Sequence, residues 1–143
     1  MRFFVVYGEP MTKGRPRFSR KTGTTYTPAK TVEYENLIKL SYKNACPDDE
    51  LFDGDTPLYV KISAYVSIPS SASKKKRQEM LDGKIRPTKK PDVDNIVKTI
   101  MDAGNGVIWH DDKSVVEVIV CKWYSDNPRV EVCVDRVEEI EPF

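Results

Sequence analysis

The chain has 143 residues, of which 39% are hydrophobic and 31% charged, and its formal net charge is +1. This length is typical of a single domain, and the composition is typical of a folded protein rather than a disordered one. The longest apolar run, Phe3 to Tyr7, is too short to span a bilayer or to act as a secretory signal. We therefore expect a cytoplasmic protein with no membrane partner.

The first half of the chain predicts a strand, a long loop, a helix and a second strand. Residues 2–8 are rich in aromatic and β-branched types, which favours a strand. Residues 9–30 hold three prolines, two glycines and six basic residues, which indicates an irregular loop or hairpin. Apolar spacing predicts a helix from Thr31 that ends before Pro47. Strict alternation then predicts a strand over residues 58–67.

The second half predicts two helices followed by two strands. A polar helix is expected over residues 73–82, and a strongly amphipathic one over 93–103 with a turn at Gly104-Asn105-Gly106. The strands are expected at 114–123 and 128–136. The order β-α-β-α-α-β-β predicts an α/β (α+β) fold, with one mixed sheet, helices packed on it and a single domain over residues 1–143.

Cysteine, histidine and glycine patterns exclude several kinds of site. Cys46, Cys121 and Cys133 have no CxxC spacing and His110 has no second histidine, so we expect reduced thiols and no zinc site. Trp109 and His110 are expected to be structural. No GxSxG motif or phosphate-binding glycine loop is present, so no small-molecule cofactor is expected. Catalysis would have to use carboxylates, lysines or hydroxyls.

The near-neutral net charge conceals basic segments on both sides of acidic ones. Residues 1–45 carry nine Lys or Arg against three acids, and residues 74–90 carry eight against two. Residues 46–60 carry five acids and no base, and residues 91–112 carry five aspartates against Lys98. Such segregation indicates basic surfaces beside an acidic centre. The alternative explanation of this charge segregation is that the charged segments are ordinary solvent-exposed surfaces.

The acidic centre lies on the helix predicted over residues 93–103. Asp94, Lys98 and Asp102 follow one edge of this helix at i, i+4 and i+8, and Asp92 lies at its start. A second pair, Asp111-Asp112, follows a short connection that we expect to fold back towards the helix start. Carboxylates from separate elements suit Mg²⁺, which prefers oxygen ligands and activates water for attack on a phosphate. Lys98 would stabilise the charge that develops there.

Structural roles for these acids remain open at this point. Aspartate at a helix start is often a cap, and Asp94 with Lys98 has the spacing of an ordinary helix ion pair. A calcium-binding EF-hand loop starting at Asp92 is excluded, because Ile96, Val97 and Ala103 occupy positions that require other residue types.

Basic residues flank the acids along the chain, as binding to a phosphate backbone would require. Those expected to contact DNA are Lys13, Arg15, Arg17, Lys74, Lys75, Lys76, Arg77, Lys89 and Lys90. For residues 74–77, a solvated helix face is the competing interpretation.

These residues together resemble the RusA family of Holliday junction resolvases. The resemblance rests on Lys90-Pro-Asp-Val-Asp-Asn-Ile-Val-Lys98, on Met101-Asp-Ala103 and on Trp109-His-Asp-Asp112. Upstream, Gly8-Glu-Pro10, Lys13-Gly-Arg-Pro-Arg-Phe18 and Tyr26-Thr-Pro28 look like the Gram-positive and phage branch of the family. The chain departs from the pattern at Gly104, where many members have a larger apolar residue.

The resemblance implies a homodimeric, Mg²⁺-dependent endonuclease that cuts four-way DNA junctions with symmetric nicks, in recombination and repair. It places the essential acids on Asp92, Asp94 and Asp112 and the essential lysine on Lys98, with Asp111 as a further candidate ligand. It also implies Mn²⁺ as a substitute metal and a bacterial protein of host, prophage or phage origin. The alternatives are a nuclease acting on flaps or forks, and a junction-binding module that does not cleave.

Overall fold

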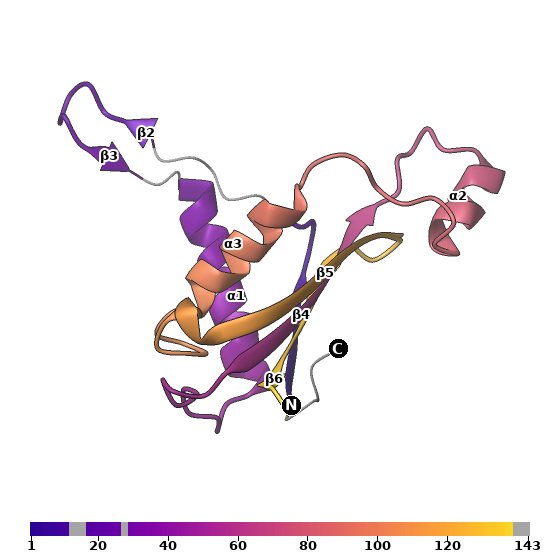
Figure 1. Ribbon diagram of the computed structural model, residues 1–143. Helices are drawn as coiled ribbons and strands as arrows, with labels where there is room; N and C mark the ends of the chain where they lie inside the picture. The colour runs from indigo at the N-terminus through magenta and orange to yellow at the C-terminus, as the bar shows by residue number, and fades with distance from the viewer. Residues whose placement is uncertain (12–16, 27–28, 139–143) are drawn as a thin grey trace.

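The computed structural model describes residues 1–11, 17–26 and 29–138. The elements, in chain order, are β1 (Arg2–Tyr7), β2 (Arg17–Phe18), β3 (Thr25–Tyr26), α1 (Ala29–Ala45), β4 (Leu58–Ser67), α2 (Lys74–Leu81), α3 (Val93–Gly104), the 3₁₀ turn η1 (Asp112–Ser114), β5 (Val115–Ser125) and β6 (Arg129–Arg136) (Figure 1). The predicted α+β domain with a mixed sheet is confirmed. The small β2–β3 hairpin lies inside residues 9–30, where an irregular loop or hairpin was expected.

The main sheet has the strand order β1-β6-β4-β5. Strands β4 and β5 are parallel, whereas β6 pairs antiparallel with both β1 and β4. The parallel pair needs a long crossover, and the segment containing α2 and α3 provides it. Consecutive strands β5 and β6 are not neighbours, because β4 lies between them. Strand β5 therefore forms one edge of the sheet.

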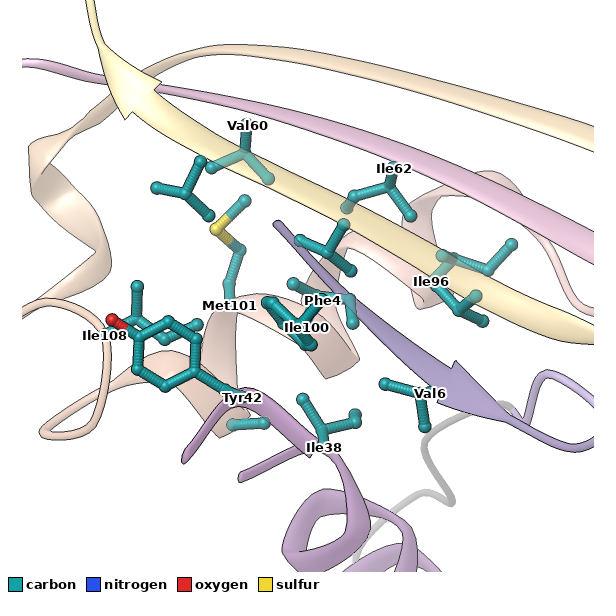
Figure 2. Packing of buried hydrophobic residues seen from close by; sticks show 14 of the residues in the cluster. Phe4, Val6, Ile38, Tyr42, Val60, Ile62, Ile96, Ile100, Met101 and Ile108 are labelled. Atoms are coloured by element: carbon teal, nitrogen blue, oxygen red, sulfur yellow. The ribbon is translucent and has the colours of Figure 1, made fainter. Parts of the chain in front are cut away.

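One face of the sheet and two helices form the hydrophobic core. Alternate residues of β4, namely Leu58, Val60, Ile62 and Ala64, are completely buried, as the alternating pattern predicts. Figure 2 shows the side chains of β1 and β4 meeting those of α1 and α3, such as Ile38 and Ile100. The ring of Phe4 packs edge-on against Tyr42, with 5.4 Å between the ring centroids.

Helix α3 buries most of its predicted apolar stripe. Ile96, Ile100 and Met101 lie in the core, whereas Val93 in the first turn is 44% exposed. Thr99 is buried as well, and its hydroxyl donates a hydrogen bond to the Asn95 carbonyl. That internal hydrogen bond lets a polar residue occupy a core position.

Two further expectations concern the thiols and the membrane. Cys46, Cys121 and Cys133 are free cysteines, as predicted. Among residues 1–11, 17–26 and 29–138, no helix combines the length and the apolar character that crossing a membrane requires.

Candidate active site

Asp92 occupies the N-cap position of α3 but does not act as a cap through its side chain. No hydrogen bond joins its carboxylate to the first backbone N–H groups of the helix. The N-cap of α2 behaves differently, because the hydroxyl of Ser73 accepts a hydrogen bond from the Lys76 amide at 3.2 Å. The exposed carboxylate of Asp92 is therefore available to a ligand, with the positive end of the helix dipole behind it.

Asp94 and Lys98 follow on the exposed edge of the same helix, one turn apart. The ion pairs found among the described residues join Met1 to Asp135, Arg2 to Asp49, Arg77 to Asp126 and Arg129 to Glu131. Asp94 and Lys98 are thus not held together by an ion pair, and both charged groups face solvent. Asp102, two turns beyond Asp94, is half-buried.

The pair Asp111-Asp112 divides into two different environments. The carboxylate of Asp111 accepts a hydrogen bond from the Lys113 amide at 2.9 Å and caps η1. Asp112 is half-buried as the first residue of η1. Because capping already engages the carboxylate of Asp111, Asp112 is the better placed of the two to serve a ligand.

The structure places the two groups of acids at opposite ends of α3. Pro91, directly before Asp92, lines a pocket with Val66, Ser67 and Tyr124, at the carboxyl ends of β4 and β5. η1 lies at the other end of these strands (Figure 1). There the Ser114 hydroxyl donates a hydrogen bond to the Gly54 carbonyl. A helix of 12 residues is about 18 Å long. The expectation that Asp111-Asp112 folds back to the helix start is therefore wrong, because the connection returns only as far as the last turn of α3.

The connection between α3 and η1 is held by Trp109, which is completely buried. Its indole N–H donates to the Asn105 side chain at 3.0 Å, and the amides of Val107, Ile108 and Trp109 point to the Gly104 carbonyl. A Cβ on Gly104 would lie 2.4 Å from the Trp109 ring, so only glycine fits there. This contact gives Gly104 a packing role that sequence reasoning had not connected to Trp109.

Glu9 is a further acid near the start of α3 that sequence reasoning did not select. It lines the same pocket as Lys89, Lys90 and Pro91, and its carboxylate accepts a hydrogen bond from the Ser67 amide at 3.4 Å. The signal in the sequence was its place in Gly8-Glu9-Pro10, a motif noted for its resemblance alone. The structure thus gathers acids and lysines around the start of α3.

The basic residues of α2 project from the body on an arm, which we define as residues 68–90 (Figure 1). Lys74, Lys75 and Lys76 are exposed, whereas Arg77 forms an ion pair with Asp126. The arm is anchored on β5 by Arg86, whose guanidinium lies 3.4 Å from the centroid of the Trp123 ring. Lys84, Lys89 and Lys90, which complete its basic residues, are also exposed.

The remaining predicted DNA contacts lie in the N-terminal segment. Lys13 and Arg15 lie outside the described residues. Arg17 begins β2 of the small hairpin, and the structure describes its backbone.

The donor set suits a hard divalent cation, although the structure does not gather it into one cluster. No group of three or more His, Cys, Asp or Glu side chains in the described ranges is close enough to hold a metal. Mg²⁺ is commonly bound by one or two carboxylates and completes its shell with water and substrate phosphate. Asp92 and Asp94, exposed and two residues apart, fit that mode of binding.

Comparisons with known proteins give the chain a family. The model of the family described as endodeoxyribonuclease RusA matches residues 7–135. The chain is also 40% identical over 136 residues to YqaN of Bacillus subtilis strain 168, described as an uncharacterized protein; the match covers 94% of this chain and 95% of that one.

Proposed function

The chain belongs to the RusA family of endodeoxyribonucleases, and from that premise we propose that it resolves four-way DNA junctions by paired, symmetric nicks in a Mg²⁺-dependent reaction. The family is one of Holliday junction resolving endonucleases and acts on branched DNA. Recombination and repair are the processes in which such junctions arise. Mn²⁺ is the expected substitute for Mg²⁺.

Asp92 and Asp94 would hold the metal at the start of α3. Asp112 lies at the other end of this helix, about 18 Å away in the same chain, and is a separate candidate acid rather than a ligand of that ion. The metal, when bound, polarises the scissile phosphate and supplies a hydroxide for in-line attack. Lys98 lies between the two groups of acids and stabilises the negative charge that develops on the phosphate. Asp111 supports this arrangement by capping η1.

The observation that carries this proposal is the uncommitted carboxylate of Asp92. A binding module without cleavage would use its acids as caps and ion pairs. At the N-cap of α3 the side chain makes no capping hydrogen bond, and within residues 1–11, 17–26 and 29–138 neither Asp94 nor Lys98 forms an ion pair. Exposed carboxylates of this kind would repel DNA unless a cation lay between them and the phosphates.

The DNA backbone is gripped on both sides of α3. In the view of Figure 1, the α2 arm and the β2–β3 hairpin project on opposite sides of the start of this helix. Lys74, Lys75 and Lys76 on the arm, with Lys89 and Lys90 beside Asp92, bind phosphates. Lys13, Arg15 and Arg17 are further proposed phosphate contacts.

The active species is a homodimer. A four-way junction has two-fold symmetry, and productive resolution requires two nicks at related positions. One chain offers one acidic helix, so a two-fold symmetric pair would supply both nicks.

The test compares cleavage with binding in one variant. Asp92→Asn should lose junction cleavage and keep or increase junction affinity, because a metal ligand is lost together with a charge that repels phosphate. Asp48→Asn, at an exposed acid far along the chain, is the matched control and should cleave normally. Normal nicking by Asp92→Asn at saturating Mg²⁺ would remove Asp92 from the metal site.

A further inference from the structure

The return segment, which we define as residues 84–91, connects the helix of the α2 arm to the start of α3 (Figure 1). It contacts the edge strand β5 at Lys122 and Trp123. Pro87 and Pro91 lie in this segment, and proline has no backbone N–H. The segment therefore lacks two of the donors that strand pairing would use, and side chains make its contacts with β5 instead.

Lys122 binds the return segment at two points. Its ammonium donates a hydrogen bond to the Lys89 carbonyl at 2.5 Å. Its own carbonyl accepts a hydrogen bond from Nε of Arg86 at 2.7 Å. Edge strands leave carbonyls without a partner strand, and Arg86 supplies the missing donor here. One residue of β5 thus holds the segment at two residues that are three positions apart.

Trp123 holds the segment on the opposite face of the sheet, because successive strand residues point to opposite sides. The Arg86 guanidinium lies 3.4 Å from the centroid of the Trp123 ring. Gly83, directly before the segment, packs against the same ring: a Cβ there would lie 3.1 Å from it, and the φ of +77° favours glycine. We call Lys122, Trp123 and Arg86 the β5 clamp.

The β5 clamp lies just ahead of the candidate metal ligand Asp92. The bound carbonyl of Lys89 is three residues before Asp92, and Pro91 between them is buried and restricted in φ. Asp92 makes no capping hydrogen bond, so no contact of its own side chain with the helix end fixes its position. The backbone on either side of Asp92 therefore determines where its carboxylate lies, and the β5 clamp holds the backbone that precedes it.

We propose that the β5 clamp, through Lys122, positions Asp92 for metal binding. This role rests on the proposed function and adds to it a positioning residue that contacts neither the metal nor the DNA. Misplacement of a group in the active site by about 1 Å can slow a reaction about 100-fold. A hydrogen bond to the backbone before Asp92 can therefore control the rate from outside the site.

A direct contact between Lys122 and a DNA phosphate is the competing role. The structure disfavours it, because Lys122 is half-buried and its ammonium already donates to a carbonyl of its own chain. Lys89 and Lys90 are exposed beside it. The two roles predict different results, since a phosphate contact contributes about 0.9 to the slope of log K against log salt and a positioning residue contributes nothing.

The test uses Lys122→Met, which keeps most of the side-chain length and removes the donor. Single-turnover cleavage of a four-way junction is measured over a range of Mg²⁺ concentrations. The variant should need at least about tenfold more Mg²⁺ for the half-maximal rate, while the salt slope of junction binding in chelator stays at the wild-type value. Lys122→Arg should restore most of the wild-type response, because a guanidinium can still donate to the Lys89 carbonyl. Lys61→Met, at an exposed lysine of β4, is the matched control and should respond like wild type.

Hydrogen exchange in the metal-free protein tests the β5 clamp without cleavage. The Ile96 amide donates to the Asp92 carbonyl at 3.0 Å, so its exchange reports how firmly the start of α3 is held. Lys122→Met should speed exchange at Ile96 and leave the Ile62 amide of β4 unchanged, which shows that the sheet is intact. Arg86→Leu should act in the same direction. The double variant should show less than the sum of the two effects, because both changes release the same segment.

The outcomes separate this role from the proposed function. A wild-type Mg²⁺ response in Lys122→Met would overturn the positioning role and leave the proposed resolvase standing. A salt slope lower by about 0.9 with that unchanged response would assign Lys122 to DNA binding instead. A wild-type chain that cuts no junction would overturn the proposed function. In that case unchanged exchange at Ile96 in Lys122→Met would overturn the β5 clamp as well, and faster exchange would support it.

Discussion

Asp111 and Asp112 are neighbours in sequence that the structure assigns to different tasks. Asp111 caps η1 through the Lys113 amide, whereas Asp112 makes no such hydrogen bond. Asp112→Asn should lower junction cleavage at least about 100-fold, because it removes the carboxylate of the pair that no capping hydrogen bond engages. Asp111→Asn should cleave within a few-fold of wild type, since an asparagine oxygen still accepts the capping hydrogen bond. Single-turnover rates at saturating Mg²⁺ would measure both, and the reverse ranking would contradict this assignment.

Gly104 is the second residue whose environment predicts a measurable effect. Gly104→Ala would place a methyl group 2.4 Å from the Trp109 ring, and overpacking of this kind costs about 1–3 kcal/mol. The helix preference for alanine offsets at most about 1 kcal/mol. Urea denaturation should therefore show a net loss of stability. Gly54→Ala is the control, because its Cβ would lie 3.8 Å from His110, an ordinary contact. Equal stability of the two variants would disprove the close packing of Trp109 on Gly104.

At the scale of elements, α1 carries a buried group that makes stability depend on alkaline pH. Burial raises the pKa of Tyr34 from 10.0 to about 12, although a backbone hydrogen bond at Met11 offsets part of the effect. A folded-state pKa above the unfolded value favours the protonated, folded form. The protonated Tyr34 side chain therefore stabilises the folded state by about 2–3 kcal/mol. This stabilisation is fully present below pH 10 and is lost as the pH rises through about 12.

Tyr34→Phe isolates this contribution. The free energy of unfolding in urea should fall less steeply between pH 9 and pH 11 in Tyr34→Phe than in wild type. Tyr7→Phe, at a side chain 65% exposed, should follow the wild-type curve. Parallel curves for wild type and Tyr34→Phe would show that Tyr34 does not titrate in this way.

The α2 arm should determine much of the salt dependence of DNA binding. Replacing Lys74, Lys75 and Lys76 with glutamine should weaken junction binding, and each lost phosphate contact should lower the slope of log K against log salt by about 0.9. Adding Arg77→Gln should change the slope less, because Arg77 is already paired with Asp126. Replacement of Lys39 and Lys43 on α1 is the control. An unchanged slope in the triple variant would mean that the arm faces solvent.

At the scale of the whole molecule, the local elements followed from the sequence and their arrangement did not. The strand over residues 58–67 could be predicted because apolar and polar residues alternate strictly along it. Helix α3 could be predicted from its apolar stripe and from the glycine that ends it. The position of β4 between β5 and β6 depends on long-range pairing, which no local pattern encodes. The β2–β3 hairpin agrees with the irregular loop or hairpin expected over residues 9–30, but no local pattern gave the positions of its strands.

The candidate site shows the same division. Residue spacing was enough to predict that α3 carries the candidate site, since Asp92, Asp94 and Lys98 lie at the positions that a helical wheel predicts. The position of Asp112 could not, because it depends on Trp109 closing onto Gly104 at the end of the helix. Glu9 is close to Lys89 and Lys90 only through tertiary structure.

The central claim is that this chain cuts four-way junctions in pairs of symmetric nicks and requires a divalent metal to do so. The most direct measurement incubates the wild-type protein with end-labelled four-way junction, flap, fork and linear duplex, with Mg²⁺ or with chelator. We predict that the four-way junction is cut by far the fastest, at symmetry-related positions on opposing strands, and that chelator abolishes cutting while junction binding persists. Cleavage of flaps or forks at equal or higher rates, or paired nicking in chelator, would contradict the account.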